Sequence, residues 1–316
     1  MTNNKQTKTL SIRDGFGQGI AELVERDSKV VVLTADLAES TRVSGVFNHF
    51  PSQAIECGVS EQNMMGVAAG LAAVGKIPFV NSFAVFSPGR SWDQLRVSVC
   101  YNKTNVKVVG HHVGFSASFD GATHQALEDI ALTRVLPNLV VLQPCDFHEA
   151  RQCVFAAAKH NGPTYLRISK SSVGLVTDKD KEFVIGKGEV LQQGRDLTLV
   201  ISGALTASCL AAARQVVSAK VEIIKLSTIK PLDVDVLKKS AQKTKRVLVV
   251  EDHQVAAGLG SAVAETLSEC LPVPVYRHGV FDTFGESGSE SDLLSKYKLD
   301  TIGISQKITQ VARRDI

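Results

Sequence analysis

The segment VVVLTADLAES, residues 30–40, is a short apolar run followed directly by polar residues. Four similar runs occur before residue 170, and Ala-rich or amphipathic stretches separate them. Continuously apolar strands that alternate with helices are typical of parallel sheets covered on both faces. The pattern therefore predicts an α/β domain. The runs are VVVL (30–33), PFV (78–80), VKVV (106–109), LVVL (139–142) and YLRI (165–168).

The second half of the chain shows the same alternation. Helical patterns at 207–217 and 260–269 lie among four strand-like runs, which indicates another α/β unit. A polar, charged stretch at 171–194, which includes DKDKE, separates the two halves. We therefore predict two domains, residues 1–175 and 185–316. The four runs are LTLVIS (197–202), VEIIKL (221–226), RVLVVE (246–251) and VPVYRH (273–278).

The composition excludes several classes of protein. The net charge of +3 comes from 35 basic and 32 acidic residues without a block of like charge, so nucleic acid is not expected as a partner. We expect no secretory signal and no membrane span, because the first residues are polar and the apolar run at 64–75 is short and rich in Gly and Ala. Six cysteines without C-x-x-C spacing favour reduced thiols in a cytoplasmic protein.

The stretch ECGVSEQNMMGVAAGL, residues 56–71, places the carboxylate of Glu61 before many small residues. One interpretation makes Ser60 a helix N-cap and Glu61 an early helical residue that suits the positive end of the helix dipole. That interpretation does not explain the glycines and alanines, which favour close approach of another backbone or subunit. A carboxylate at such an interface would be desolvated and would need a partner from a ligand or a second chain.

The segment HHVGFSASFDGATHQALED, residues 111–129, concentrates imidazoles and a carboxylate after a predicted strand. Such a set binds a divalent metal, or binds and protonates a hydroxylated substrate. The spacing matches no standard zinc motif, so metal is the weaker option. The alternative is a polar loop in which Asp120 or Thr123 caps a helix from Gln125 onward. The candidate residues are His111, His112, Asp120 and His124.

Two further patterns carry weaker signals. Phe83 and Phe86 follow the strand at 78–80 and are either core aromatics or a stacking wall for a planar heteroaromatic ring. Gly258-x-Gly260 resembles part of a dinucleotide fingerprint, but the full G-x-G-x-x-G is missing. We therefore predict no nucleotide site.

Several motifs together resemble the transketolase family, from about Ser11 to the C-terminus. GVSEQNM followed by DGATHQ is specific to the transketolase-like branch of thiamine diphosphate enzymes. The resemblance implies a pyrimidine-binding domain, with a parallel sheet flanked by helices, followed by an α/β transketolase C-terminal domain. The motifs are TADLAES, GVSEQNMMGVAAGLA, FAVFSPGRSWDQLR, DGATHQALEDIALTRVLPNL and EDHQVAAGLGSAVAE.

The GDG motif of a complete transketolase, which helps to hold Mg²⁺ and the cofactor diphosphate, does not occur in this sequence. The chain therefore resembles the C-terminal subunit of a split transketolase. The resemblance implies an N-terminal partner subunit that carries the diphosphate-binding domain and the Mg²⁺ ligands. We expect no metal ligand in this chain, and we expect the two kinds of subunit to form a heterotetramer.

The resemblance also implies roles at the cofactor. Glu61 matches the catalytic residue that hydrogen-bonds N1′ of the aminopyrimidine of thiamine diphosphate. Phe83 and Phe86 match the aromatic wall around that ring, and Asp36 matches a residue beside the thiazolium end. A third aromatic residue of the wall, often Tyr, is replaced by Gly89, so the wall differs in detail.

On the substrate side, the resemblance assigns the donor hydroxyls to three residues of the histidine loop, with the two histidines also catalytic. These are His112, Asp120 and His124. An acceptor anion would be held by a basic and hydroxyl cluster composed of Arg13, Ser40, His112 and Lys170. The last position is usually Arg, and Lys lacks the bidentate fork that suits a tetrahedral anion. The anion is therefore a less tightly held phosphate or another group such as a sulfonate.

The expected function is transfer of a two-carbon ketol unit from an anionic ketose to an aldose, active only with the partner subunit. Three alternatives remain. A β-type subunit of a 2-oxo acid dehydrogenase has no use for the histidines of DGATHQ. A deoxyxylulose-phosphate-synthase-like enzyme is disfavoured by the missing domain and by Gln125. A scaffolding subunit is disfavoured because Glu61 and the histidine loop are intact. The sequence does not identify the sugars.

Overall fold

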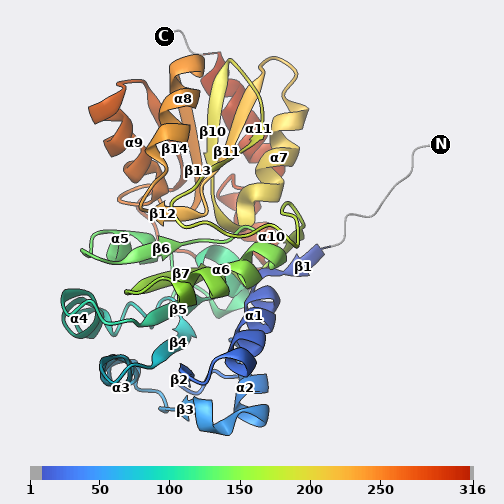
Figure 1. The fold of residues 1–316 in the computed structure, drawn as a ribbon. Helices are drawn as coiled ribbons and strands as arrows, with labels where there is room; N and C mark the ends of the chain where they lie inside the picture. The colour runs from blue at the N-terminus through green and yellow to red at the C-terminus, as the bar shows by residue number, and fades with distance from the viewer. Residues whose placement is uncertain (1–8, 314–316) are drawn as a thin grey trace.

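A computed structural model describes residues 9–313 of the chain. Two main sheets lie one above the other, and β1 (Thr9–Ser11) pairs with β8 (Ser172–Gly174) in a small separate ladder (Figure 1). The N-terminal part of the chain builds most of the lower sheet, and the C-terminal part builds the upper one. The predicted α/β architecture, with a parallel sheet flanked by helices in the first half, is confirmed.

The lower sheet has the strand order β12-β6-β7-β5-β4-β2-β3. Its neighbours are parallel except β12 and β6, which are antiparallel. Every residue of β2, β5 and β7 is buried, as expected for strands with helices on both faces. The strands are β2 (Val30–Thr34), β3 (Ala54–Glu56), β4 (Ile77–Phe83), β5 (Lys107–His111), β6 (Val140–Leu142), β7 (Thr164–Ile168) and β12 (Thr228–Lys230).

Two groups of helices cover this sheet. Val32 packs with α1 (Ile12–Arg26) and α6 (Phe147–Lys159), whereas its neighbour Val31 packs with α3 (Glu61–Ala73). Successive strand side chains point to opposite faces, so one strand serves both helix layers. The remaining helical segments are α2 (Ser44–His49), η1 (Pro51–Gln53), α4 (Trp92–Gln94), η2 (Leu95–Tyr101), η3 (Gly114–Asp120) and α5 (Asp129–Arg134).

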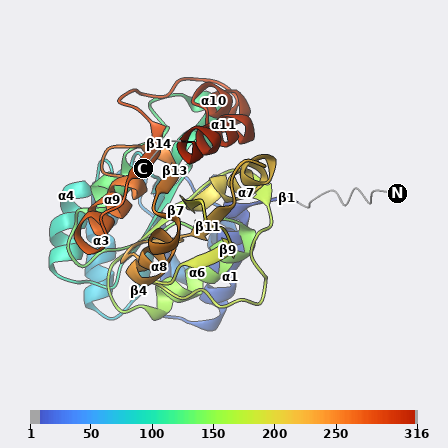
Figure 2. The same ribbon diagram turned by 90° about the horizontal axis from the view of Figure 1, so that it is seen from above.

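The upper sheet has the order β14-β13-β10-β11-β9, with β9 antiparallel to its neighbour. Seen from above, α8 and α9 lie on one side of it, and α7 and α11 on the other (Figure 2). Its strands are β9 (Glu189–Gln192), β10 (Leu197–Ile201), β11 (Val221–Lys225), β13 (Val247–Gln254) and β14 (Val275–Val280). Its helical segments are η4 (Gly203–Leu205), α7 (Thr206–Gln215), α8 (Val234–Thr244), α9 (Leu259–Cys270), α10 (Glu290–Lys296) and α11 (Thr301–Ala312).

A strand from the second half of the chain completes the lower sheet, and the two sheets share a core. β12 follows β11 of the upper sheet in the chain but pairs with β6 of the lower sheet, with Thr228 opposite Leu142. One hydrophobic cluster contains residues of both sheets, among them Val80 of β4 and Val200 of β10. The two halves of the chain are therefore joined by backbone hydrogen bonds as well as by side-chain packing.

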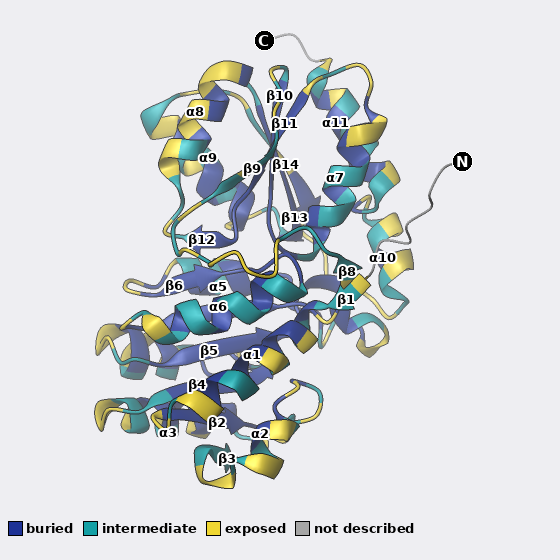
Figure 3. Cartoon of the chain, turned by 45° about the vertical axis from the view of Figure 1, so that its right-hand side comes forward, coloured by how far each residue is buried: buried dark blue, intermediate teal, exposed yellow. Residues whose placement is uncertain are grey.

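Residues 175–188 carry neither helix nor strand and include the exposed run 178–182. Figure 3 shows this run in yellow where the chain passes between the two sheets. Asp146 holds its beginning, because one carboxylate oxygen accepts the backbone N–H of Val176 at 2.7 Å and of Thr177 at 2.6 Å. The domain limits of 175 and 185 stay a prediction.

No helix within residues 9–313 has the length and apolar character needed to cross a bilayer.

Candidate functional site

The candidate residues gather at the carboxyl ends of parallel strands. Thr34, Asn81 and Phe83 lie at the ends of β2 and β4, and His111 ends β5 directly opposite Phe83. Loops that follow such strands meet at one edge of the sheet, which is where open α/β sheets bind ligands. The loops after β2, β4 and β5 therefore share one edge of the sheet.

Four side chains from two of these loops form what we call the ring cluster: Phe83, Phe86, His112 and His124. The two phenylalanine rings are nearly parallel, with centroids 6.0 Å apart and an interplanar angle of 16°. The His112 ring lies 4.0 Å from Phe83, and the His124 ring approaches Phe86 edge-on at 5.3 Å. The fold thus places two imidazoles against a pair of stacked aromatic rings.

His112 is a neutral imidazole with one free donor. Its Nε2 lies 3.4 Å from Nη1 of Arg13, and a guanidinium only donates, so Nε2 accepts and the proton is assigned to Nδ1. Burial, then the charges of Arg13 and Lys170, lowers the pKa of His112 to about 3. His112 Nδ1 is buried without a hydrogen-bond partner. A buried, unpaired donor next to the aromatic wall is available to a ligand oxygen.

Arg13 joins the ring cluster to the loop after β2. Nη1 of Arg13 also donates to the backbone carbonyl of Ser40 at 3.0 Å, and its Nε is buried without a partner. Lys170 is exposed and lies near enough to His112 to lower the pKa of that imidazole. Arg13, Ser40, His112 and Lys170 therefore lie in one cationic region, as an anion subsite requires.

The two aspartates are less closely tied to the ring cluster. Asp36 and Asp120 are exposed, and neither carboxylate makes a hydrogen bond or ion pair with residues 9–313. Asp36 adopts a positive φ of 60°, and its backbone N–H donates to Glu56 Oε1 at 2.8 Å. Asp120 ends η3, four residues before His124. Their proposed contacts with a cofactor and a substrate stay predictions.

Glu61 is the first residue of α3, as the sequence indicated, but Ser60 does not cap the helix with its side chain. Its hydroxyl donates instead to the Cys57 carbonyl at 2.7 Å. The Glu61 side chain is 5% exposed, and Nη1 of Arg90 lies 3.2 Å from one carboxylate oxygen and 3.3 Å from the other. The guanidinium carbon of Arg90 also lies 4.1 Å from the centre of the Phe86 ring.

This contact corrects the expectation that a ligand or second chain must supply the partner of Glu61. A cation of the same chain fulfils that need. Arg90 was missed because it lies 29 residues from Glu61, outside any helical spacing, although it was present in the motif FAVFSPGRSWDQLR. The contacts form one row that runs from Glu61 through Arg90, the ring cluster and Arg13 to Ser40.

His111 does not belong to this row. It is fully buried at the end of β5, its Nε2 lies 3.2 Å from Asn81 Oδ1, and its ring packs edge-on against Phe16 of α1 at 5.0 Å. Burial lowers its pKa well below the ordinary value, so it is a neutral core histidine. The suggestion that His111 acts with the other histidines is wrong. Within residues 9–313 no group of three His, Cys, Asp or Glu side chains is arranged to hold a metal ion.

The histidine loop is held by tertiary contacts, and no helix begins at Gln125; the next helix, α5, begins at Asp129. The Gln125 amide donates to the carbonyls of Ser118 at 3.0 Å and Glu286 at 2.8 Å. Gly114 N–H donates to the Ala126 carbonyl at 2.9 Å, which closes the loop. The alternative of a capped helix is therefore wrong, because these contacts keep residues 121–128 in irregular structure.

An ion cluster behind the loop was not visible in the sequence. Arg167 of β7 is fully buried and binds Asp129 at 2.9 Å and Asp252 of β13 at 2.6 Å. Its Nη2 also donates to the carbonyl of Ala126 at 3.3 Å. These contacts connect the histidine loop to both sheets. The only sequence signal was a charged residue within the apolar run YLRI.

Comparison with known proteins now identifies the fold. The transketolase pyrimidine-binding domain model matches residues 8–175, and the transketolase C-terminal domain model matches residues 186–304. This chain belongs to the transketolase family. A putative transketolase C-terminal section from Methanocaldococcus jannaschii is 39% identical over 311 residues, covering 96% of this chain and 97% of that protein.

Two further transketolases are similar over nearly the whole chain. A 6-deoxy-6-sulfo-D-fructose transketolase subunit from Clostridium sp. (strain MSTE9) is 37% identical and covers 96% of this chain and 95% of its own length. A solved split-gene transketolase, described as an inactive β4 tetramer, is 43% identical with a TM-score of 0.89, covering 96% of this chain and 98% of that one. This chain therefore matches each of these relatives over nearly its whole length.

The residues of this transketolase-family chain fit the aminopyrimidine half of thiamine diphosphate. Such a ring needs a carboxylate at a ring nitrogen and an aromatic face, which Glu61 and Phe86 offer. Arg90 already shows that one planar nitrogen-bearing group can meet both at once. Ser82 Oγ and His112 Nδ1 are buried at the same edge without partners, so polar capacity for a ligand remains.

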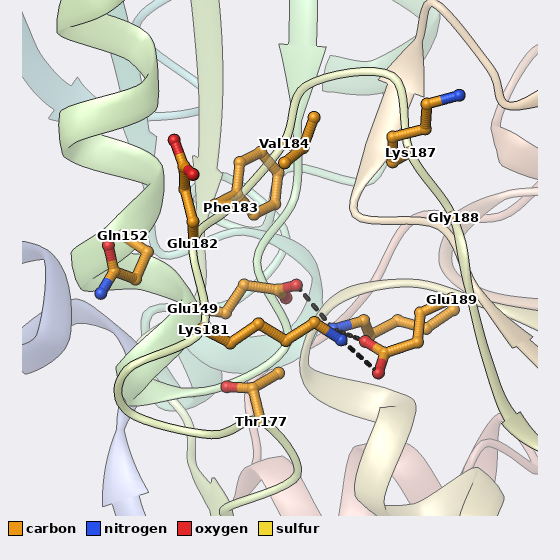
Figure 4. A pocket seen from close by; sticks show the side chains of 11 residues that line it. Glu149, Gln152, Thr177, Lys181, Glu182, Phe183, Val184, Lys187, Gly188 and Glu189 are labelled. Atoms are coloured by element: carbon orange, nitrogen blue, oxygen red, sulfur yellow. Dashed lines mark hydrogen bonds and ion pairs between the residues drawn. The ribbon is translucent and has the colours of Figure 1, made fainter.

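Two other features of the transketolase-family fold need no ligand. A cavity of about 140 Å³ beneath residues 175–188 is lined by Glu149 and Glu189, among others (Figure 4). Lys225 also lines it and binds Glu149 at 2.7 Å and Glu189 at 3.2 Å, so these charges are paired. At Gly258-x-Gly260, the Glu251 carboxylate accepts the backbone N–H of Leu259 at 2.7 Å and of Gly260 at 3.0 Å. The protein's own carboxylate thus occupies the N-terminus of α9.

Proposed function

We propose that this chain is one subunit of a two-subunit, thiamine diphosphate-dependent transketolase that moves a two-carbon ketol unit from an anionic ketose to an aldose. The row of contacts from Glu61 to Ser40 carries the proposal. It places a buried carboxylate at one end of an aromatic wall and a cationic region at the other, with two imidazoles between them. The transketolase names of the relatives support the same reaction class.

Each residue assigned to the cofactor and to the donor sugar then has a task. Glu61 binds and orients the aminopyrimidine through a ring nitrogen, and Phe83 and Phe86 exclude water from the ring. The His112 Nδ1–H donates a hydrogen bond to a substrate oxygen, while His124 and Asp120 exchange protons with hydroxyls of the ketose donor. When bound, thiamine diphosphate supplies carbanion stabilisation. Asp36, in the loop after β2, is assigned to the thiazolium end of the cofactor.

The anion of the substrate is held by Arg13 and Lys170, with Ser40 and His112 beside them. Arg13 has a buried, unpaired Nε, and Lys170 is exposed, so both retain capacity for a tetrahedral anion. A sugar phosphate and a sugar sulfonate present the same chemistry to this region. The name of the Clostridium relative includes a sulfonated sugar, so a substrate panel must include both anions.

The diphosphate and Mg²⁺ ligands are assigned to a partner subunit, and the active assembly to a heterotetramer. The exposed face of α3 supports this assignment, because Gly66 and Gly70 are exposed and a Cβ built there would meet no atom within 4 Å. Such a face allows another subunit to approach the backbone near Glu61. All six cysteines are free, which suits a reducing compartment, and we place the enzyme in the cytoplasm.

The decisive experiment measures ketol transfer by this chain reconstituted with a subunit that carries the diphosphate-binding domain. Glu61→Gln should leave assembly intact but lower turnover by about 100-fold or more, because proton transfer by a positioned group contributes at least that much. The exposed Glu269→Gln is the matched control and should retain activity.

Three results would contradict the proposal. Full activity of the Glu61→Gln complex would remove the assigned role. Lipoamide-dependent decarboxylation of a 2-oxo acid would favour the dehydrogenase alternative. We also expect the isolated chain to be inactive and to bind thiamine diphosphate weakly, so tight Mg²⁺-dependent binding to it alone would oppose the assignment of these ligands to a partner.

A further inference from the structure

Arg90 contacts the two groups that an aminopyrimidine ring would need, the Glu61 carboxylate and the Phe86 ring. Its Nη1 lies 3.2 and 3.3 Å from the two oxygens of Glu61. Its guanidinium lies over the Phe86 ring, 4.1 Å from the ring centre. A guanidinium is planar and delocalised, and it stacks on aromatic faces while donating in its own plane. An aminopyrimidine bound to Glu61 would use the same carboxylate and the same aromatic face.

The backbone around Arg90 is built to direct this side chain back over Phe86. A Cβ at Gly89 would lie 2.0 Å from the carbonyl oxygen of Val85, so only glycine fits the turn. The Arg90 N–H donates to the Phe86 carbonyl at 2.8 Å, and Gln62 Nε2 donates to the Arg90 carbonyl at 3.2 Å. Gly89 stands where the family often has a third aromatic residue. Here that position is part of a turn that places the Arg90 guanidinium over Phe86.

The contact also meets an energetic need. Glu61 is 5% exposed, and an ionised carboxylate at such a depth is costly unless a charge or donor pairs with it. Arg90 offsets that cost, but its own side chain is 52% exposed. The Arg90 guanidinium can therefore move out into solvent, where a long basic side chain keeps its charged head group hydrated.

We propose that Arg90 is a placeholder for the aminopyrimidine ring, a role that rests on the proposed function. In the free subunit its guanidinium occupies the ring's place on Phe86 and keeps Glu61 paired. The ring and the guanidinium exclude each other, because both need the same carboxylate and the same aromatic face. Arg90 must therefore swing away before the ring can bind.

The test measures binding of thiamine, which lacks the diphosphate, to the full chain by isothermal titration calorimetry. Arg90→Ala removes the competitor and should lower the Kd by about tenfold or more relative to wild type. Arg96→Ala is the matched control, since Arg96 is an exposed arginine of the neighbouring segment, and it should leave the Kd unchanged. Adding Glu61→Ala to Arg90→Ala should abolish the gain, because the ring then loses its carboxylate.

Circular dichroism checks that the variants are folded. Arg90→Lys keeps the charge but loses the planar group, and it should give a smaller gain of about threefold. An equal Kd for wild type, Arg90→Ala and Arg90→Lys would overturn the proposal, as would the absence of thiamine binding in all of them. If Arg90→Ala gains affinity while the reconstituted wild-type complex transfers no ketol unit, the proposed function fails and the placement of Arg90 stands.

Discussion

Replacing Arg167 by Met should destabilise this protein far more than loss of an exposed arginine. The Arg167 side chain is 0% exposed, and its partner Asp129 is 1% exposed. It binds Asp129 at 2.9 Å and Asp252 at 2.6 Å. Methionine fills part of the volume but leaves two carboxylates without their cation. Breaking a buried ion pair in this way costs about 3–5 kcal/mol.

That cost gives a measurable change in melting temperature. The unfolding entropy of a chain of this size is about 0.7 kcal/mol per kelvin, so a loss of about 4 kcal/mol lowers Tm by about 6 °C. Arg26→Met is the control, because that side chain is 64% exposed in its pair with Glu22. It should cost less than about 0.5 kcal/mol, which is under 1 °C. Differential scanning calorimetry measures both.

The deficit of Arg167→Met should shrink as the pH falls. Without the guanidinium, the buried Asp129 and Asp252 carboxylates carry charges that no cation compensates. The penalty is full while both carboxylates are ionised and is relieved as acid protonates them in the folded protein. The Tm difference from wild type should therefore narrow between pH 7.5 and about pH 5. A deficit equal to that of Arg26→Met, or one that does not narrow, would refute this reasoning.

Two more predictions concern the histidine loop. Gly114→Ala should lower stability by about 2 kcal/mol or more, because φ is +59° and the added Cβ would lie 2.2 Å from a buried carboxylate oxygen. Gly75→Ala is the control: its φ is +88° but the space around it is open, so it should cost about 1 kcal/mol. Urea denaturation compares the two variants, and equal losses of stability would contradict the steric argument. The pKa of His112 is about 3 in the native state, so stability should fall as the pH drops below the unfolded value of about 6.5 and the unfolded chain binds an extra proton. Between pH 6.5 and 5, the free energy of unfolding of His112→Gln should fall by about 2 kcal/mol less than that of the wild type. Parallel profiles of stability against pH for the two proteins would contradict this.

The sequence was informative where local pattern and local structure agree. The nine apolar runs that were read as strands are strands, because a continuously buried strand needs apolar side chains on both faces. The short strands β1, β3, β8, β9 and β12 were missed, because three or four residues give too little pattern to separate a strand from a loop.

At the candidate site, position along the chain was predictable and contact was not. The start of α3 at Glu61 followed from local sequence, but its pairing with Arg90 depends on how β4 directs the next loop back over the helix. His111 and His112 are adjacent, and the sequence treats them alike. In the structure they differ because neighbouring residues at a strand end point to opposite sides, so His111 enters the core and His112 faces the ring cluster.

The crossing of β12 into the lower sheet limits how this protein can be divided. A cut within residues 175–188 would leave β6 as an open sheet edge, because its partner Thr228–Lys230 belongs to the later fragment. An uncovered edge strand pairs readily with other chains, so the first fragment would be prone to aggregate. Splitting the chain within residues 175–188 would thus be costly at the folding step, whereas changes in the length or charge of that segment leave the β6 edge covered.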